Sequence, residues 1–594
     1  MFSRLLVANR GEIAVRIIRA CRELGVAPIA VYSDADRDAL HATMADEAYR
    51  IGPAAARASY LDADKLLEVA ASSGCDALHP GYGFFAESAD FARRCAERSI
   101  TFVGPSPEAI ERMGDKIAAR QAAQEAGLAI VPGSAAPVRS IQEARRIADA
   151  LGFPVAVKAA AGGGGKGLKV ALDRGELDRA LALAVKEAGA YFGDDTVYIE
   201  RYLARPKHVE VQVVADRHGH VLHMGERDCS LQRRHQKLIE ETPAAIDQRL
   251  RADLHAAACR LARAIRYDSI GTIECLVEDD RYYFLEMNTR VQVEHTITEM
   301  TWGVDLVKAQ LRIAAGEPLW LEQEDLYPRG HAIECRINAE SPAADFRASS
   351  GRISAYAPPA GPGVRIDSAA FSGWIIPADY DSLVAKLAVW GQDREEARLR
   401  MLRALGEFVL RGIDTTIPLF RWLLAQPVFA DSGYDTTTVE TLVNSGAAAS
   451  AHAQASVDGA EGSSGADRDE SSDGSQRLVV EVNAKRFDVR VHGPSAGLRR
   501  PDDAAPLRRA VKHNAPKLKP GGSAAILAPM HGLVAEINVG PGDTVAAGQV
   551  VAIIEAMKMM NEVIAQRSGR VDRVSASVGD TVEAGYPLVS LAEE

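Results

Sequence analysis

The chain has 594 residues, more than one hydrophobic core usually serves, and this length predicts three to five domains. Apolar residues make up 47% and charged residues 25%, which is ordinary globular usage. A net charge of −12 with no long basic run argues against sequence-independent nucleic-acid binding. The seven cysteines include no CxxC pair, so we expect a reducing compartment, no disulfide framework and no structural zinc site.

The N-terminal segment "MFSRLLVANRGE" returns to charged residues after only a few apolar ones, which is not the pattern of a signal peptide. No stretch of the sequence approaches the 18 or so apolar residues that a membrane-spanning helix needs. We therefore expect a cytoplasmic protein that does not cross a membrane.

The first 50 residues alternate between strand and helix patterns. "LLVAN" is typical of a buried strand, "GEIAVRIIRACRELG" of an amphipathic helix that ends at Gly25, and "APIAVYS" of the next strand. This βαβ order predicts a parallel sheet. The turn after the first strand has one glycine and no GxGxxG, which disfavours NAD binding.

A glycine run follows in a compact α+β segment, expected over residues 116–204. In "VKAAAGGGGKGLKV", glycines allow backbone amides to approach phosphate oxygens closely, and Lys158 and Lys166 supply positive charge. The run is not a Walker loop, because GxxxxGK[ST] is absent. The alternative is an ordinary glycine-rich surface loop.

The segment "GTIECLVEDDRYYFLEMNTRVQVEH" predicts a hairpin with a three-residue turn at Asp279-Asp280-Arg281. This register places Glu274 directly opposite Glu286, with their Cβ atoms about 5 Å apart. Two facing carboxylates repel unless something bridges them, and a hard divalent cation carrying nucleotide phosphates is the simplest bridge. Asn288 adds a further oxygen ligand. An exposed acidic strand face is the alternative.

The composition changes after residue 444. Residues 445–475 are dominated by Ala, Ser and Gly and cannot bury enough apolar area to offset their ordering entropy, so a disordered linker is expected. A coil of that length spans roughly 30 Å on average. Residues 476–522 predict a hairpin with Asn483 near its turn, followed by a stiffer linker. We expect this hairpin either to dock a partner or to be only structural.

The last segment, residues 523–594, contains an internal repeat. "HGLVAEINVGPGDTVAAGQ" and "SGRVDRVSASVGDTVEAGY" align at a constant offset that places Gly532 on Gly569 and Gly548 on Gly585. Two such β units predict a small flattened barrel or sandwich, with Lys558 in the connection between them. "APMHGLV" and "EAMKMM" resemble a biotin carboxyl carrier domain, in which Lys558 is the biotinylated residue. A lipoyl domain has the same architecture, but the methionines on either side of Lys558 favour biotin.

The remainder resembles biotin carboxylase over roughly residues 1–444. "LVANRGEIAVRIIRA", "HPGYGF", "ERDCSLQRRHQK", "EMNTRVQVEHTITEM" and "GHAIECRINAE" occur in that order. The whole chain resembles the α subunit of an acyl-CoA carboxylase, in the short bacterial form. The implied fold is an α/β N-terminal domain (1–115), an ATP-grasp core made of a lid (116–204) and an α+β catalytic domain (205–444), the flexible linker, and a small all-β biotinyl barrel.

The resemblance also implies site residues. Those for ATP are Lys116, Lys158, Gly163, Gly164, Gly165, Lys166, Gly167, Glu200, Leu203, His208, Gln232, His235, Glu274 and Glu286. Glu274, Glu286 and Asn288 are expected to hold Mg²⁺ or Mn²⁺. Glu294 is the expected base on bicarbonate, with Arg290, Gln292 and Val293 positioning that anion to form carboxyphosphate. Arg336 is expected to stabilise the biotin enolate, Tyr82 and Gly83 to seat the biotin ring, and Lys237 to act in catalysis through phosphate. Packing is the alternative for Tyr82 and the expectation for Cys229.

Some positions depart from the family pattern: Thr296 stands where proline is common, and Phe85 and Ser88 replace the usual leucine and asparagine.

Nothing in the chain resembles a carboxyltransferase, so a separate β subunit is expected to pass the carboxyl group to acetyl- or propionyl-CoA. A biotin protein ligase is the other expected partner. The open alternatives are another acceptor (pyruvate, urea or a branched acyl-CoA) and a non-catalytic biotin carrier.

Overall fold

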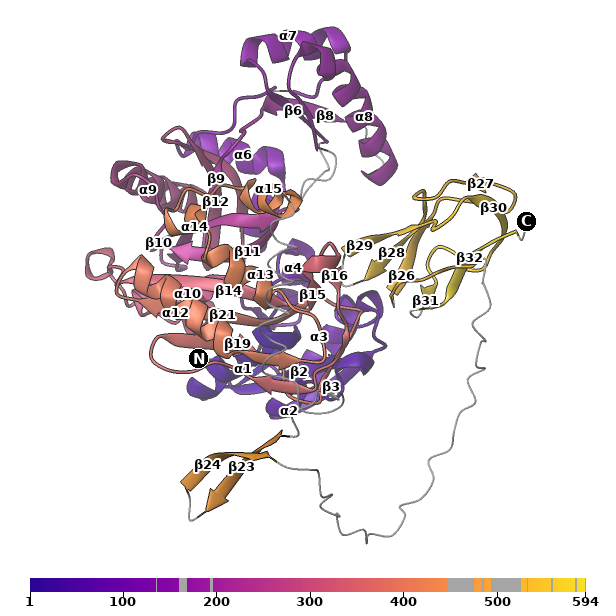
Figure 1. The fold of residues 1–594 in the computed structure, drawn as a ribbon. Coiled ribbons are helices and arrows are strands. Elements are labelled where there is room, and N and C mark those ends of the chain that lie inside the picture. Colours follow the sequence, from indigo (N-terminus) through magenta and orange to yellow (C-terminus); the bar gives the residue numbers. More distant parts are fainter. Residues whose placement is uncertain are drawn as a thin grey trace.

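The structure is a computed structural model (Figure 1). It describes residues 1–445 apart from 135, 160–167 and 193–195, the strands at 475–482 and 485–492, and residues 525–592 apart from 531, 557–558 and 583–584. The predicted linkers therefore lie largely outside the described residues.

The N-terminal part confirms the predicted βαβ unit. Strand β1 (Arg4–Val7), helix α1 (Gly11–Glu23) and strand β2 (Ala27–Ser33) follow one another, and the two strands pair in parallel. They belong to a five-stranded parallel sheet in the order β3-β2-β1-β4-β5, completed by β3 (Glu47–Gly52), β4 (Ala77–His79) and β5 (Thr101–Phe102). The carboxyl end of β4 leads directly into the HPGYG segment.

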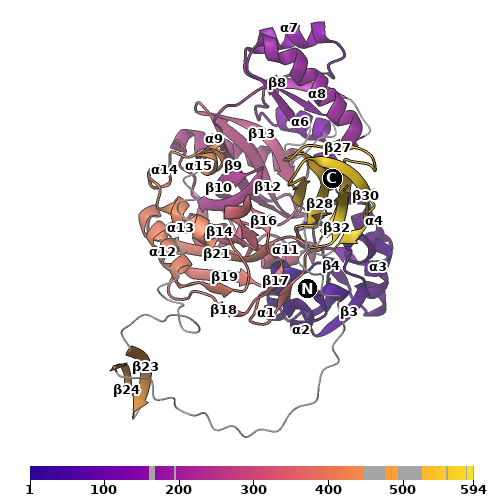
Figure 2. The same cartoon turned by 45° about the vertical axis from the view of Figure 1, so that its right-hand side comes forward.

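A small sheet forms the lid. Strands β6 (Val155–Ala159), β7 (Leu168–Ala171) and β8 (Val197–Arg201) pair in the order β7-β6-β8, with helices α7 (Ile141–Leu151) and α8 (Arg174–Phe192) packed on them. This unit stands away from the large sheet in both views (Figures 1 and 2). Helix α6 (Lys116–Glu125), at the start of the predicted lid segment, instead packs its alanines into the core of the large sheet.

The segment predicted as the catalytic domain is built on an antiparallel eight-stranded sheet in the order β13-β12-β9-β10-β11-β14-β21-β19. Its strands are β9 (Lys207–Ala215), β10 (Val221–Arg233), β11 (Gln236–Thr242), β12 (Ile270–Glu278), β13 (Arg281–Asn288), β14 (His331–Asn338), β19 (Val364–Ser368) and β21 (Leu383–Gly391). Helices α9 (Gln248–Ala264), α10 (His295–Trp302), α11 (Leu306–Ala314), α12 (Arg394–Glu407) and α15 (Thr438–Asn444) pack around it.

The β12–β13 hairpin has the predicted pairing of Glu274 with Glu286, but its predicted three-residue turn is wrong. Glu278 pairs with Arg281, so Asp279 and Asp280 alone form the turn, at φ values of 51° and 57°. A two-residue turn with two left-handed residues matches the twist of the flanking strands. The register then shifts between Glu274 and Cys275, leaving Leu285 as the extra residue of a β-bulge. The bulge restores the predicted pairing.

The C-terminal residues form two four-stranded sheets, β25-β32-β30-β27 and β29-β28-β26-β31. The repeat maps strand onto strand: β26 (Gly532–Ile537) onto β30 (Gly569–Val574), and β27 (Thr544–Val545) onto β31 (Thr581–Val582). Each sheet combines strands from both halves, as a pseudo-twofold barrel requires. The other strands are β25 (Ala525–Leu527), β28 (Val550–Ala556), β29 (Met559–Ile564) and β32 (Pro587–Leu591).

The predicted hairpin between the linkers is present as β23 (Ser475–Val482) and β24 (Lys485–His492), which pair antiparallel. Asn483, expected at its turn, lies outside the described residues. All seven cysteines are free and buried. Among the described helices, none combines the length and hydrophobicity needed to cross a membrane.

Candidate active site

A cavity of about 1450 Å³ lies against the eight-stranded sheet and collects residues from all three parts of the large body. Every predicted site residue that the structure describes in this body lines it: Tyr82, Gly83, Lys116, Lys158, Glu200, Leu203, His208, Gln232, His235, Lys237, Glu274, Glu286, Asn288, Arg290, Gln292, Val293, Glu294 and Arg336. The glycine run with Gly163, Gly164, Gly165, Lys166 and Gly167 falls outside the described residues.

A row of carboxylates crosses the sheet at the floor of this cavity. Glu286 on β13 faces Glu274 on β12, and Glu274 faces Glu210 on β9. Glu210 was not predicted from the sequence. Its strand, β9, pairs with β12, which lies far along the chain, and hairpin rules apply only to strands that are neighbours in the sequence. The next residue across the sheet is Arg227 on β10, whose Nε donates to Glu210 Oε1 at 2.6 Å.

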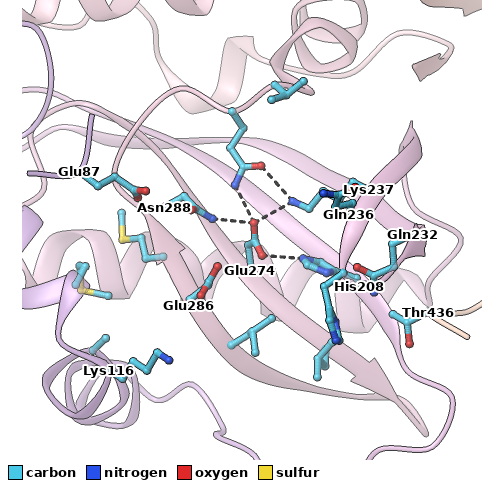
Figure 3. Close-up of a pocket in the computed structure, with 18 of the residues that line it drawn as sticks. Glu87, Lys116, His208, Gln232, Gln236, Lys237, Glu274, Glu286, Asn288 and Thr436 are labelled. Carbon is cyan, nitrogen blue, oxygen red and sulfur yellow. Dashed lines mark hydrogen bonds and ion pairs between the residues drawn. The ribbon is translucent and has the colours of Figure 1, made fainter. Parts of the chain in front are cut away.

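Lys237 is the cation at the centre of the site (Figure 3). Its Nζ donates to Glu210 Oε2 at 2.5 Å, Glu294 Oε1 at 2.7 Å and Glu274 Oε1 at 2.9 Å. A fourth contact joins it to Gln292 Oε1 at 3.2 Å. One ammonium therefore neutralises carboxylates that arrive from three separate segments of the chain.

Glu294 is held at both oxygens. Oε1 accepts from Lys237, and Oε2 accepts from Arg336 Nη2 at 2.9 Å. Burial alone would raise the pKa of this 1%-exposed carboxyl group, but the charges of Lys237, Arg336 and Arg227 outweigh burial and hold the pKa well below its usual range. Glu294 is therefore ionised at neutral pH.

Glu286 differs from the other carboxylates of the row. No described cationic side chain lies within ion-pair or hydrogen-bond distance of it, whereas Glu274 accepts from Lys237 and from Asn288 Nδ2 at 2.7 Å and lies 2.9 Å from His208 Nε2. The Glu286 side chain is open to the cavity, but desolvation by the surrounding protein, followed by the charges of Glu274 and Glu87, raises its pKa. Figure 3 shows its carboxylate beside Glu274, on the same face of the sheet. An unneutralised carboxylate facing a second one fits a hard divalent cation.

On the lid side, Glu200 on β8 accepts from Lys158 Nζ at 2.6 Å and from Arg120 Nη1. Burial would raise the pKa of Glu200, but these two cations lower it. Arg120 lines the cavity and was missed by sequence reasoning. It lies one helical turn after Lys116 on α6, so the helical period could have placed both on one face.

Arg290 is tied to the N-terminal domain through a third missed residue, Glu87. The Nε of Arg290 donates to Glu87 Oε2 at 3.1 Å, and the backbone N–H of Thr289 donates to Glu87 Oε1 at 3.1 Å. Arg290 Nη2 also donates to Asn288 Oδ1 at 2.9 Å. Glu87 lies three residues after the end of the HPGYGF motif, and this closeness was the available signal.

Tyr82 is partly packed against the N-terminal core, and its hydroxyl donates to Glu12 on α1. Glu12 also lies 3.3 Å from the ammonium of Lys386, which donates to the carbonyl of Val293 at 2.9 Å. Cys229 is fully buried, with its sulfur 4.0 Å from Glu294, and burial first, then the nearby Glu210 carboxylate, raises the pKa of its thiol well above the ordinary value. It therefore stays a protonated packing residue.

Lys558 falls outside the described residues, as does Met557. The strands on either side are described: β28 ends at Ala556, β29 begins at Met559, and these two residues pair.

The chain matches four families in order. Residues 1–110 match the biotin carboxylase N-terminal domain and 115–322 the carbamoyl-phosphate synthase L chain ATP-binding domain. Residues 334–441 match the biotin carboxylase C-terminal domain and 524–591 the biotin-requiring enzyme family.

Two relatives show how far the similarity reaches. "Biotin carboxylase 1" of Bacillus subtilis is 52% identical over 444 residues, covering 74% of this chain and 99% of that protein. The "Biotin-dependent acyl-coenzyme A carboxylase alpha3 subunit" of Mycobacterium leprae is 41% identical over 601 residues, covering 99% of this chain and 98% of that protein. A biotin carboxylase of Campylobacter jejuni, solved as a "beta-gamma-ATP" complex, superposes with a TM-score of 0.71 at 44% identity, covering 74% and 99%.

The chain therefore belongs to the biotin-dependent carboxylases, as a biotin carboxylase that carries its own C-terminal biotinyl domain. It is an ATP-grasp ligase that carboxylates biotin at the expense of ATP, and it works with a carboxyltransferase partner. The predicted fold class is confirmed.

Proposed function

We propose that this chain is the α subunit of an acyl-CoA carboxylase. It carboxylates biotin attached to its own Lys558, and a separate β subunit passes the carboxyl group to acetyl- or propionyl-CoA. The supporting observation is the similarity over 99% of the chain, barrel included, to a relative named as such a component. A pyruvate carboxylase chain of Methanothermobacter thermautotrophicus is more similar, at 51%, but covers only 72% of this chain.

In this proposal Glu294 is the base. It takes the proton of bicarbonate, whose oxygen then attacks the γ-phosphorus of ATP, releasing ADP and giving carboxyphosphate. Arg290, Gln292 and the backbone of Val293 position the bicarbonate beside it. Lys237 and Arg336 hold Glu294 ionised before substrate binds. When these cations turn toward the bound anions, the pKa of Glu294 rises and it becomes a stronger base.

The other predicted site residues keep their roles in this proposal, and a place in the cavity supports those roles for the residues that the structure describes. Lys116, Lys158, Glu200, Leu203, His208, Gln232 and His235 contact ATP in this proposal, together with Gly163, Gly164, Gly165, Lys166 and Gly167. Glu274, Glu286 and Asn288 would hold Mg²⁺ or Mn²⁺, which neutralises the phosphate charge. Tyr82, Gly83 and Arg336 form the seat of the biotin ring, whose nitrogen accepts the carboxyl group.

Transfer of labelled bicarbonate tests the acceptor. The full chain, purified with its bound partners, is incubated with ATP, ¹⁴C-bicarbonate and acetyl-, propionyl- or longer acyl-CoA, with pyruvate and urea as alternatives. Label on acetyl- or propionyl-CoA supports the proposal. Label on pyruvate, on urea or on no acceptor except the protein contradicts the acyl-CoA assignment.

Glu294→Gln tests the base. We expect bicarbonate-dependent ADP release to fall by about 10²- to 10⁴-fold, the usual contribution of a positioned general base. Biotinylation of Lys558, measured by avidin binding, should be unchanged, because the barrel has a hydrophobic core of its own. Full ADP release by this variant would exclude Glu294 as the base.

A further inference from the structure

Two carboxyl side chains face each other below the site, outside the row that binds Lys237. Glu240 on β11 pairs directly with Glu334 on β14, and both are 0% exposed. Residues directly opposite in an antiparallel sheet lie on one face, with Cβ atoms about 5 Å apart. Two ionised carboxylates at that separation, away from water, repel strongly.

Each carboxyl group has one oxygen with a hydrogen-bond donor and one without. Glu240 Oε1 accepts from Arg336 Nε at 2.6 Å, and Glu334 Oε2 accepts from the hydroxyl of Thr296. The remaining oxygens, Glu240 Oε2 and Glu334 Oε1, are buried with no donor among the described groups. An unsatisfied buried carboxylate oxygen is costly, and one proton between the two groups would satisfy both.

The charged groups around the pair leave Glu334 without a cation of its own. The nearest ammonium on β21, Lys386, donates to the carbonyl of Val293 and lies 3.3 Å from Glu12, and the β21 residue opposite Glu334 is Ala388. Arg336 is bonded to Glu240 and Glu294. Lys237 contacts the upper carboxylates, and Thr296 on α10 is neutral. Among the described side chains, the hydrogen-bond donor to Glu334 is thus a neutral hydroxyl, whereas the donor to Glu240 is a charged guanidinium.

Their pKa values follow this difference. Burial raises the pKa of Glu334 well above its usual range, although the more distant Lys386 opposes the shift. Burial also raises the pKa of Glu240, to about 7, against the lowering effect of Arg336. Glu334 is therefore the group of the pair that keeps its proton at neutral pH.

We propose that Glu334 is a neutral carboxylic acid that keeps its proton and donates a hydrogen bond through it to Glu240, and that this pair fixes the position of Arg336. Glu334 and Glu240 are positioning residues, since neither touches substrate: Glu240 holds Arg336, and Arg336 holds Glu294 at 2.9 Å. The role of the pair rests on the proposed function of Arg336 and Glu294. The protonation state of Glu334 does not.

Infrared spectroscopy tests the protonation state without turnover. The full-length wild-type chain and Glu334→Gln are compared at pH 8, in H₂O and in D₂O. We expect the wild type to show the C=O stretching band of a protonated carboxyl group, shifted in D₂O and absent from the variant. A wild-type spectrum that lacks this band would show that Glu334 is ionised and would overturn the proposal, whatever Glu294 does.

A pair of nearly isosteric variants tests the positioning role. As pH falls through about 7, Glu240 of the wild type becomes neutral, Arg336 loses its anionic partner, and bicarbonate-dependent ADP release declines. Glu334→Gln keeps a neutral donor to Glu240, so the midpoint of this acid limb should not move. Glu334→Met removes the donor, so the midpoint should rise by roughly one pH unit, the equivalent of one hydrogen bond to a charged group.

The two outcomes separate cleanly. If Glu334 is ionised, both variants remove a negative charge beside Glu240, and both midpoints should move to lower pH. A purely structural role would lower the rate at every pH without moving the midpoint. Either result contradicts the proposal, and the Glu294→Gln experiment reports separately on the proposed function.

Discussion

The barrel and the eight-stranded sheet bury their residues in opposite ways. Among the described residues of the barrel, every buried side chain is apolar, from Ile526 to Leu591. The large sheet buries Glu210, Arg227 and Lys386 completely. Burial of apolar area stabilises a fold directly, whereas buried ion pairs must first overcome the cost of desolvation. The buried residues of the barrel thus serve its stability, and the sheet gives up stability to hold charges in fixed positions.

All five tryptophans lie between Trp302 and Trp422, so tryptophan fluorescence follows the large body alone. Avidin capture of the biotin that is proposed to sit on Lys558 follows the barrel. These two readouts allow the contrast between the regions to be tested one variant at a time.

The largest effect is expected for Lys237→Met. Removing the ammonium leaves Glu210, Glu274 and Glu294 facing one another without their shared cation, and breaking a buried ion pair costs about 3–5 kcal/mol. The fluorescence-detected urea midpoint should fall, ADP release should be lost, and biotinylation should persist. An unchanged midpoint would mean that the buried charges of the sheet are stabilised by other groups.

The second effect is a pH dependence at Glu241. Burial would raise the pKa of this carboxyl group, but His331 at 2.7 Å and Arg394 at 2.8 Å lower it to about 2. A lowered pKa in the folded state stabilises the protein above the unfolded value of 4.5, and the gain disappears as pH falls toward 2. The gain is about 3 kcal/mol at neutral pH.

Glu241→Gln should therefore lower the fluorescence-detected stability at pH 7, and the difference from wild type should shrink between pH 4.5 and about 2. Glu395→Gln, which alters an exposed ion pair with Arg398, is the matched control and should change little. A difference that stays constant with pH would exclude the ion pairs of Glu241 as its cause.

A smaller effect, confined to the barrel, is expected for Gly532→Ala. A Cβ there would lie 2.6 Å from the Glu555 carbonyl oxygen, and such overpacking costs about 1–3 kcal/mol. Biotinylation should fall while tryptophan fluorescence is unchanged. The repeat supplies the control: a Cβ at Gly569 meets only the Leu591 side chain, at 3.3 Å or more, so Gly569→Ala should be milder. Equal losses of biotinylation in Gly532→Ala and Gly569→Ala would show that the close approach to the Glu555 carbonyl oxygen is not the cause of the effect.

The smallest effect is a gain. Asp280 at the β12–β13 turn has a φ of 57°, a conformation that glycine adopts without strain. Asp280→Gly should stabilise the large body by up to about 1 kcal/mol, because Asp-Gly is a favoured pair in this turn type. ADP release should be unaffected. A lower urea midpoint would show that the entropy lost by glycine exceeds the strain relieved.

Sequence reasoning succeeded where the information was local or repeated. The constant offset between Gly532 and Gly569 predicted two equivalent β units, and the strands repeat accordingly. The facing pair Glu274 and Glu286 came from a single hairpin. Glu210 was missed because the pairing of β9 with β12 depends on long-range topology, which no local pattern encodes.

The same limit explains the contacts between domains. Glu87 reaches Arg290 across some 200 positions of sequence, and only the folded arrangement of the N-terminal domain brings them together. The prediction of a three-residue turn at Asp279 was wrong for another reason. Counting residues gave the right partner for Glu274, but it could not distinguish a longer turn from a shorter turn followed by a bulge.

The bulge at Leu285 separates the tip of the β12–β13 hairpin from its base. A three-residue turn without a bulge and a two-residue turn with one bring the same two glutamates face to face. A residue inserted at Asp279-Asp280 can therefore be absorbed by loss of the bulge, with no change at the cavity floor. Related chains with hairpin tips of different length would then share one spacing between these carboxylates, and the tip is free to diverge while the chemistry below it stays constant.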